Sequence, residues 1–334
     1  MTNDKLRWGI LSTANIGKKA VIPAIKASSN GTVAALASRD GQHAQVVATE
    51  LGIPQSYGSY EELLADPGID AVYIPLPNSL HYEWTIKAAR AGKHILCEKP
   101  LALNADQCME MAVAAEQAGV LLMEAFMYRF HPQLAQVRAL LDQGAIGDVR
   151  LLRSAFTFRL TNPANIRLQS ELGGGSLMDV GCYCVNLSRT LFDAEPVEVQ
   201  AFASWSAGGV DEQIVGTLHF ANGRYAQFDS ALTLARRETY QVVGTDGVLD
   251  LPVAFLPGTN DTLIYQNRGG PNEQSYTVAG VDEYRLMVEH FAGAVLGQRP
   301  VRYPASEAAR NVRVIEALYR SARNNGRPEA VEPV

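Results

Sequence analysis

Residues 173–186, GGGSLMDVGCYCVN, bring together side chains that could do chemistry. Cys182 and Cys184 suggest a redox or metal device, whereas Asp179 and Tyr183 could transfer a proton. Residues two apart on an α-helix project about 200° apart around its axis, so these cysteines cannot share a metal or a disulfide with each other. We therefore expect both cysteines to be small packing residues.

The same segment predicts a polar stripe on a helix. Residues i, i+4 and i+7 share a helix face, so Asp179, Tyr183 and Asn186 would lie together on an otherwise apolar segment. The alternative is that Asp179 only caps the helix, but a cap has no need of the other two residues. A carboxylate on this stripe could hold a lysine or a substrate hydroxyl.

A second candidate site lies near the N-terminus, in ILSTANIG (residues 10–17). A dinucleotide-binding fingerprint G-x-G-x-x-G would align there as Ser12-x-Ala14-x-x-Gly17, with only the last glycine kept. Ser12 and Ala14 are small enough for a diphosphate to approach the backbone amides at the start of the next helix. The alternative is an ordinary tight turn. The cofactor-binding residues predicted here are Ser12, Thr13, Ala14, Asn15 and Ile16.

The second predicted strand ends in LASRD, where the cofactor's ribose would lie. The position that would be acidic in an NAD site is Ser38, with Arg39 beside it. A hydroxyl and a guanidinium suit a 2′-phosphate, so the sequence favours NADP over NAD. Asp40 is expected to cap the next helix, whereas an Asp40 pointed at the ribose would favour NAD.

Two further strands end in LPNSLH and CEKP, and the carboxyl ends of parallel strands are where an open α/β sheet binds ligands. Asn78 and His81 could contact the cofactor, or could be only the N-cap and a first-turn residue of a helix. Lys99 could be a solvated surface lysine, but Pro100 restricts the backbone before it. The cofactor-binding residues predicted here are Pro75, Leu76, Asn78, His81, Glu98 and Lys99.

These candidates need a particular set of elements to position them. Short apolar runs alternate with helical patterns over the first 123 residues, which predicts an α/β fold with a doubly wound parallel sheet. The predicted strands are 8–11, 33–38, 71–74, 94–97 and 120–123. The predicted helices are 15–28, 41–51, 60–65, 79–91 and 104–118, the last capped by Asn104.

The texture changes after Gly147. Strand-like runs such as LLRSAFTF and QIVGTLHF follow one another with little helix between them, which predicts an open, largely antiparallel sheet. Helical patterns return at 281–297 and 305–323, and we expect a C-terminal helix to pack back on the first domain. The predicted domains are a dinucleotide-binding domain, 1–125, and a substrate-binding and oligomerisation domain, 126–334.

Composition narrows the class of protein. The chain has 334 residues, 47% of them hydrophobic, which is ample for two cores. A net charge of −6 without a basic run argues against nucleic acid or an anionic membrane as partner, and no apolar run is long enough to span a bilayer. Four cysteines, no C-x-x-C and no H-E-x-x-H predict a reduced compartment and no metal site. With no signal peptide at the N-terminus, we expect a cytoplasmic protein.

Together these motifs resemble the glucose-fructose oxidoreductase / inositol dehydrogenase (Gfo/Idh/MocA) family. The resemblance covers nearly the whole chain. It rests on the nucleotide turn, PNSLH (77–81), AGKHILCEKPLA (91–102), EAFMYRFHP (124–132) and GGGSLMDVGCYCVN. It implies a Rossmann domain followed by an α/β domain with an open sheet, through which an oligomer forms. It also implies a nicotinamide-dependent oxidoreductase acting on a carbinol of a sugar, polyol or diol, without a metal.

The resemblance assigns catalytic roles as well. The family's catalytic lysine falls on Lys99, and its aspartate and histidine fall on Asp179 and Tyr183, where the histidine is replaced by tyrosine. With tyrosine at this position, the chain is similar to the branch of the family that contains glucose-fructose oxidoreductase, NADP-linked xylose dehydrogenases and dimeric dihydrodiol dehydrogenases. The tyrosine therefore weakens the inference that this chain shares the substrate of the inositol dehydrogenases.

A tyrosine can replace the histidine only if its proton is made easier to remove. Its pKa of about 10 lies roughly three units above neutral pH, which corresponds to about 4 kcal/mol. An ammonium about 4 Å away at an effective dielectric of 20 supplies about 4 kcal/mol. Lys99 could therefore make Tyr183 a general acid/base. The tyrosine-lysine pair of short-chain dehydrogenases is excluded because residue 187 is leucine.

The remaining candidates concern the substrate and competing functions. We expect Arg129, Asn165 and Arg167 either to bind substrate hydroxyls, with Asp179 and Tyr183, or to form surface ion pairs. The leading hypothesis is an NADP-dependent oxidoreductase acting on an aldose, a pyranose or a cyclic diol. The alternatives are a non-catalytic NADP(H) sensor, and an enzyme whose tightly bound cofactor shuttles between two sugars. Substrate identity, direction of reaction and oligomer size are not determined by the sequence.

Overall fold

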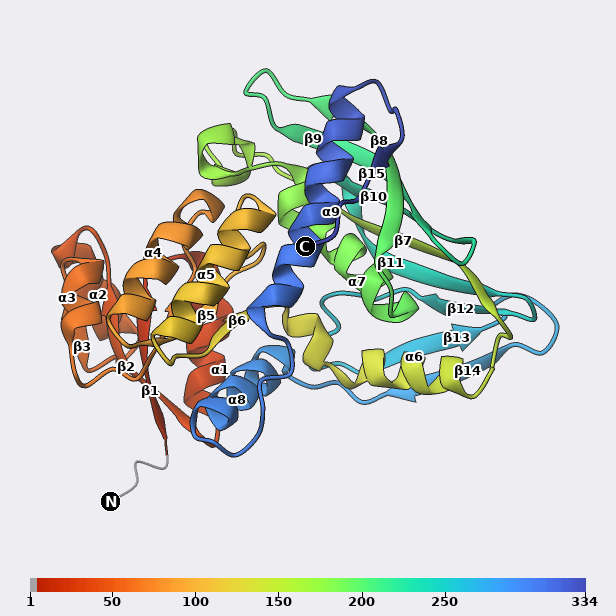
Figure 1. Cartoon of the computed structure of the whole chain (residues 1–334). Coiled ribbons are helices and arrows are strands. Elements are labelled where there is room, and N and C mark those ends of the chain that lie inside the picture. The colour runs from red at the N-terminus through yellow and green to blue at the C-terminus, as the bar shows by residue number, and fades with distance from the viewer. Residues whose placement is uncertain (1–4) are drawn as a thin grey trace. The chain divides into compact units, whose positions relative to one another are not determined.

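The structure is a computed structural model that describes residues 5–334, and the chain forms two compact units (Figure 1). Unit 1 comprises the chain up to Met127 together with Asp282–Ala309. Unit 2 comprises Tyr128–Val281 and Arg310–Val334. The chain therefore passes from one unit to the other three times.

Unit 1 is built on a six-stranded parallel sheet. The strands lie in the order β3-β2-β1-β4-β5-β6, which is the order of a dinucleotide-binding doubly wound fold. The predicted parallel sheet is confirmed, and the sequence reading missed only the short, partly exposed β3 among its strands. The strands are β1 (Leu6–Leu11), β2 (Gly31–Ala37), β3 (Gln55–Tyr57), β4 (Ala71–Ile74), β5 (His94–Cys97) and β6 (Leu122–Glu124).

The helices of unit 1 connect these strands. Asn104 caps α5 as predicted, because its side chain accepts a hydrogen bond from the Gln107 N–H at 2.8 Å. The helix predicted over 15–28 differs: it contains a π-helical turn, η1, before α1. The helical elements are η1 (Gly17–Val21), α1 (Ile22–Ala27), α2 (Gly41–Glu50), α3 (Tyr60–Ala65), α4 (Asn78–Arg90), α5 (Ala105–Gln117) and α8 (Glu283–Val295).

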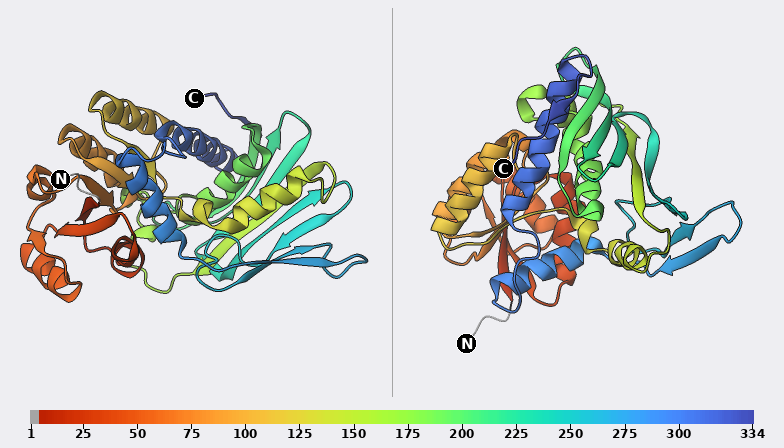
Figure 2. Two further views of the ribbon diagram at one scale, coloured as in Figure 1. Left: turned by 90° about the horizontal axis from the view of Figure 1, so that it is seen from below. Right: turned by 45° about the vertical axis from the view of Figure 1, so that its right-hand side comes forward.

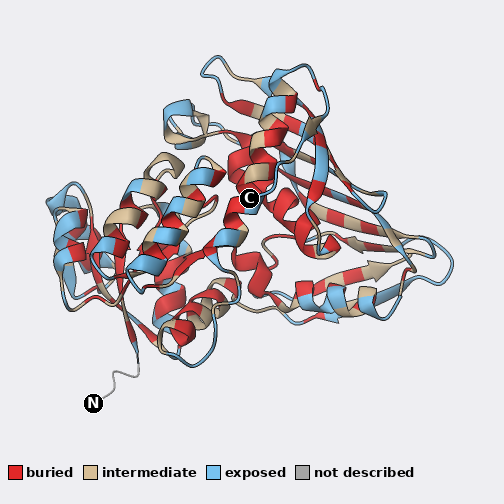
Figure 3. Ribbon diagram, in the orientation of Figure 1, coloured by how far each residue is buried: buried red, intermediate tan, exposed pale blue. Residues whose placement is uncertain are grey.

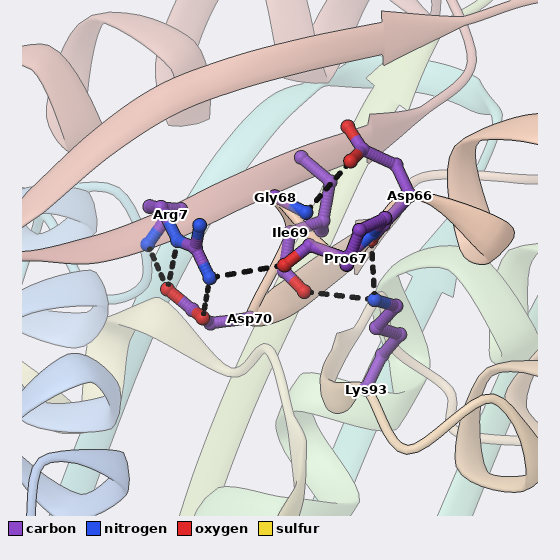
Figure 4. A network of polar contacts seen from close by, with 7 residues as sticks. All are labelled: Arg7, Asp66, Pro67, Gly68, Ile69, Asp70 and Lys93. Atoms are coloured by element: carbon purple, nitrogen blue, oxygen red, sulfur yellow. Dashed lines mark hydrogen bonds and ion pairs between the residues drawn. The ribbon is translucent and has the colours of Figure 1, made fainter.

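A polar network joins the amino-terminal ends of three strands of unit 1 (Figure 4). The Arg7 Nε donates to Asp70 at 2.9 Å and its Nη2 donates to the other carboxylate oxygen at 2.6 Å. The Lys93 ammonium donates to the backbone carbonyls of Asp66 at 2.6 Å and Ile69 at 2.9 Å. This edge lies opposite the carboxyl ends of the strands, so we assign the network to stability and not to binding.

Unit 2 is built on a nine-stranded sheet in the order β14-β13-β12-β11-β7-β10-β9-β8-β15. β7 and β10 run parallel, and the other neighbouring strands described are antiparallel, so the predicted largely antiparallel sheet is confirmed. The strands are β7 (Val149–Arg159), β8 (Pro196–Trp205), β9 (Asp211–Phe220), β10 (Arg224–Ala231), β11 (Thr233–Gly244), β12 (Val248–Leu251), β13 (Thr262–Gln266), β14 (Gln274–Val278) and β15 (Glu329–Ala330).

The core of unit 2 lies on one face of this sheet (Figure 2). A π-helical turn, η5 (Leu177–Gly181), leads into α7 (Cys182–Phe192), and both pack against β7 and β10. Every residue of 175–190 is buried (Figure 3). The other helical elements are η2 (Met127–Phe130), α6 (Pro132–Asp142), η3 (Ile166–Leu168), η4 (Ser170–Leu172) and α9 (Ala305–Arg323), the last shared with unit 1.

Candidate active site

The turn after β1 presents backbone donors to an anion. Ser12 has φ +140°, a region that favours glycine, and its hydroxyl accepts from the Ala14 N–H at 3.1 Å. Within residues 5–334, the N–H groups of Thr13, Asn15 and Ile16 make no hydrogen bond. These free amides at the start of a helix fit the diphosphate of a dinucleotide.

The end of β2 fits a 2′-phosphate. Ser38 is half-buried and Arg39 is exposed. Asp40 caps α2 as expected, because its carboxylate accepts from the His43 N–H at 3.0 Å. Arg39 also contacts the phenol of Tyr60; burial raises the pKa of this phenol, and the Arg39 guanidinium partly offsets the rise. The basic group at this position is therefore Arg39, and the nearby carboxylate is engaged by the helix.

The first turn of α4 carries two predicted residues. Asn78 is the first residue of the helix and Pro77 holds the N-cap position, so the N-cap assignment of Asn78 was one residue off. His81 lies in the first turn as predicted, and it is fully buried. Its Nδ1 lies 2.9 Å from the Pro100 carbonyl oxygen and its Nε2 lies 2.9 Å from that of Leu76. Burial lowers the pKa of His81.

Lys99 lies two residues after the end of β5 and is half-buried. Its N–H donates to the Glu98 carboxylate at 3.4 Å, and the other oxygen of that carboxylate accepts from the Tyr73 hydroxyl at 2.5 Å. Beyond the cis peptide that joins Lys99 to Pro100, the Leu101 N–H donates to the buried Glu124 at 2.8 Å. The backbone on both sides of the lysine is therefore held by carboxylates.

Asp179 lies in η5 and is buried, with only 9% of its surface exposed. Its carboxylate accepts from the Arg167 Nε at 2.6 Å. The Gly175 N–H donates to the Arg167 carbonyl at 2.8 Å, and a Cβ on Gly174 would lie 2.5 Å from that same oxygen. The glycines thus let the loop carrying Arg167 fold closely onto η5. Asn165 caps η3 by accepting from the Arg167 N–H at 3.0 Å.

Tyr183 is buried among aromatic rings of unit 2. Its ring centroid lies 5.8 Å from that of Tyr128, 5.4 Å from Phe156 and 5.5 Å from Phe255. The Tyr128 hydroxyl donates to Asn186 at 2.7 Å. These aromatic residues come from η2, β7 and the chain before β13. No sequence period connects them, so only the family motif around Tyr128 drew attention to any of them.

The helix that carries the predicted stripe is not a regular α-helix. We expected Asp179, Tyr183 and Asn186 on one face of a regular α-helix. In the structure Asp179 belongs to the π-helical turn η5, whereas Tyr183 and Asn186 belong to α7. A π-helical turn changes the angle between successive residues, so the α-helical spacing does not apply across it. Asp179 accordingly meets Arg167, while Asn186 meets Tyr128.

The other predicted residues have simpler surroundings. All four cysteines are free and buried, which agrees with the packing role expected of Cys182 and Cys184, and burial raises the pKa of Cys184 to about 12. Arg129 is buried in η2. Across residues 5–334, no group of three His, Cys, Asp or Glu side chains could hold a metal ion. No helix formed by these residues has both the length and the hydropathy of a membrane span.

One buried carboxylate was missed by sequence reasoning. Asp211, at the start of β9, accepts from the Ser176 hydroxyl at 2.6 Å, the Leu177 N–H at 2.8 Å and the Tyr319 hydroxyl at 2.6 Å. Burial raises the pKa of Asp211, and these three donors partly offset the rise. Asp211 therefore anchors the start of η5, the turn that carries Asp179. A single aspartate before an apolar strand gave no signal of this role.

The fold and the site of unit 1 define a dinucleotide-dependent oxidoreductase. Residues 6–126 match the model of the oxidoreductase family with an NAD-binding Rossmann fold, and residues 134–250 match the GFO/IDH/MocA C-terminal domain. The chain belongs to the GFO/IDH/MocA oxidoreductase family. The predicted family and the predicted oxidoreductase class are confirmed.

Several similar proteins align with most of this chain. A D-xylose 1-dehydrogenase (NADP+) from Haloferax volcanii is 44% identical over 95% of this chain and 97% of its own. A trans-1,2-dihydrobenzene-1,2-diol dehydrogenase from Xenopus tropicalis is 38% identical over 74% of this chain and 75% of its own. A 3-ketoreductase from Actinomadura kijaniata, solved with NADP and TDP-benzene, superimposes with a TM-score of 0.91 at 30% identity, covering 95% of this chain and 98% of its own.

Proposed function

We propose that this protein uses NADP(H) to transfer a hydride between nicotinamide and a carbinol or carbonyl of a sugar or a cyclic diol. The relatives that it resembles are named for xylose, a dihydrodiol and a keto sugar reaction, and two of them for NADP. The observation that carries the proposal is Tyr183, a buried phenol flanked by aromatic rings on the segment that the family uses for catalysis. A screen of NADP and NAD against aldoses, polyols and diols identifies the substrate.

The bound cofactor supplies or accepts the hydride, and the chain's own residues transfer the proton. In the oxidation direction, Tyr183 as phenolate takes the proton of the substrate hydroxyl while the carbon releases its hydride. Lys99 stabilises that phenolate by its positive charge. Asp179, held by Arg167 at 2.6 Å, orients the substrate hydroxyl. Asn165 and Arg129 remain proposed substrate contacts.

The family's solved structures support the pairing of lysine with tyrosine. Structures of the Actinomadura reductase include variants in which one lysine or one tyrosine is substituted. The positions of those two residues are separated by the same number of residues as Lys99 and Tyr183. This equal spacing is expected if the two pairs are equivalent.

The decisive test is substitution of the proposed proton donor and its partner. Lys99→Met and Tyr183→Phe should each lower kcat at least about 100-fold, the scale of general acid–base catalysis, with the Kd for NADPH nearly unchanged. Tyr225→Phe is the matched control, because Tyr225 is a 44% exposed tyrosine on β10. Near-normal turnover in both active-site variants would overturn the mechanism.

The preference for NADP over NAD has its own test. A charge-assisted hydrogen bond to a phosphate contributes roughly 1.5–3 kcal/mol, which corresponds to about 10- to 100-fold in affinity. Arg39→Ala should therefore lower kcat/KM for NADP by about that factor and leave kcat/KM for NAD unchanged. Arg90→Ala, an exposed arginine at the end of α4, is the control. Equal losses with both cofactors would contradict a 2′-phosphate contact.

We also propose that the protein is a cytoplasmic homo-oligomer that associates through the outer face of the nine-stranded sheet. Phe202 and Val215 are directly opposite each other on β8 and β9 and are 55% and 42% exposed, which supports an apolar contact. Four free cysteines support a reducing compartment. Light scattering should show an oligomer that Val215→Asp dissociates. A monomeric wild-type protein would refute this surface.

A further inference from the structure

His81 joins two loops that the proposed function uses for different purposes. One ring nitrogen lies 2.9 Å from the carbonyl oxygen of Leu76, in the loop after β4 where the cofactor is predicted to bind. The other lies 2.9 Å from the carbonyl oxygen of Pro100, the residue after Lys99. The imidazole is fully buried, so it contacts both loops from within the protein and exposes no surface to a ligand.

We propose that His81 is a positioning residue for Lys99, which fixes the loop of the lysine relative to the loop that follows β4. This inference rests on the proposed function, because it gives Lys99 a place that catalysis requires. Displacement of a reacting group by about 1 Å can cost roughly 100-fold in rate, so small movements of this loop matter.

A second buried side chain holds the same peptide group from its other side. The Pro100 carbonyl and the Leu101 N–H belong to one peptide plane. His81 from α4 contacts the oxygen, and Glu124 from β6 accepts from the N–H at 2.8 Å. With both polar ends of the plane engaged by buried groups, the plane cannot rotate without breaking a hydrogen bond.

The residue before Lys99 adds a third restraint. Glu98 accepts from the Tyr73 hydroxyl of β4 at 2.5 Å and from the Lys99 N–H at 3.4 Å. The restraints thus come from three elements, α4, β4 and β6, and they converge on residues 98–101. A solvated surface lysine would have no need of such a frame, and a polar residue as deeply buried as His81 is costly unless its hydrogen bonds are used.

A pair of amide substitutions separates the two contacts of His81. The amide nitrogen of asparagine can replace Nδ1, which faces Pro100, and the longer glutamine can replace Nε2, which faces Leu76. We expect His81→Asn to retain most of kcat. His81→Gln should lower kcat about 10- to 100-fold with little change in the Kd for NADPH, and the deuterium isotope effect on kcat with 4-deuterated NADPH should rise because hydride transfer becomes slower.

His94 supplies the matched control. It lies at the opposite end of β5, where its Nδ1 accepts from the Leu121 N–H at 2.9 Å, and it is also partly buried. His94→Asn and His94→Gln should lower the melting temperature without changing kcat or the isotope effect. The positioning role would be overturned if His81→Asn and His81→Gln lost kcat equally and only in proportion to their loss of stability.

Glu124 keeps the proposal testable if the His81 variants do not fold. Glu124→Gln retains an oxygen that can accept from Leu101 and should keep most of kcat, whereas Glu124→Met should lose at least about 10-fold. Equal activity of these two variants would overturn the inference. Failure of the proposed function would give a different result. In that case Lys99→Met would turn over normally in the same assay, and this would overturn both the proposed function and the positioning role of His81.

Discussion

Asp211 offers a sharp test of how the helix that carries Asp179 is held. Its carboxylate accepts three hydrogen bonds, from the Ser176 hydroxyl, the Leu177 N–H and the Tyr319 hydroxyl. Asp211→Ala removes the acceptor for all three. The Ser176 hydroxyl also lies 3.2 Å from the Ser230 carbonyl oxygen and keeps that acceptor, so the loss falls on Leu177 and Tyr319.

The magnitude follows from those two groups. A buried donor left without an acceptor costs about 1–3 kcal/mol, so two of them lower the free energy of unfolding by about 4 kcal/mol. Asp211→Asn differs, because its carbonyl oxygen can still accept from Leu177 and its amide can donate to the Tyr319 oxygen. We expect that variant to lie within about 1 kcal/mol of the wild type.

The pH dependence gives an independent check. Burial raises the pKa of Asp211 in the folded protein, so folding favours the protonated acid. The contribution of this residue to stability is greatest below its unfolded pKa of about 3.9 and is lost as pH rises through the higher folded pKa. Asparagine does not titrate, so Asp211→Asn should gain stability relative to the wild type as pH rises from 4 to 7.

The assay is urea unfolding followed by far-ultraviolet circular dichroism at both pH values. Asp211→Ala should move the midpoint strongly and Asp211→Asn only slightly. A loss below about 1 kcal/mol in Asp211→Ala would refute the hydrogen-bond reasoning. An Asp211→Asn protein that becomes less stable relative to the wild type between pH 4 and pH 7 would refute the electrostatic reasoning.

Two further predictions concern unit 1. Ser12→Gly should leave the free energy of unfolding within about 1 kcal/mol of the wild type, because relief of φ +140° is offset by the greater freedom of glycine in the unfolded chain and by loss of the acceptor for the Ala14 N–H; a change of more than about 2 kcal/mol would contradict this. Asp70→Asn should cost about 1 kcal/mol at pH 7, since the ion pair with Arg7 is partly exposed. Burial alone would raise the pKa of Asp70, but Arg7 lowers it, so the wild-type advantage should vanish as pH falls below about 4. An advantage that persists at pH 2 in urea unfolding would exclude Asp70 as its source.

The sequence predicted the parallel sheet well because its strands are buried apolar runs bounded by turns. β4 and β5 were predicted with the bounds that the structure shows. β3 and β12 are short and were not separated from the surrounding chain. The π-helical turns η1 and η5 were also missed, because a single residue added to a helical turn leaves no mark in a period of apolar residues.

The candidate site divides in the same way. Residues within a linear motif, such as Ser12, Lys99 and Tyr183, could be proposed from their local pattern together with the family resemblance. Asp211 and Phe255 could not, since each contacts its partners only after distant strands have paired. The function of His81 was ambiguous for a similar reason: the two carbonyl oxygens that its ring nitrogens face lie five and nineteen residues away, in loops whose proximity the sequence alone does not show.

The three passages of the chain between units affect how this protein can be made. α8 belongs to unit 1, where its Phe291 ring lies 5.4 Å from that of Trp8 and its Glu289 accepts from the Ser29 N–H at 2.9 Å. During synthesis the first 127 residues leave the ribosome well before this helix, so the apolar surface around Trp8 stays uncovered until Glu283–Val295 has emerged. A nascent nucleotide-binding unit is thus a natural client for chaperones, and a fragment ending at Met127 is a poor choice for expression.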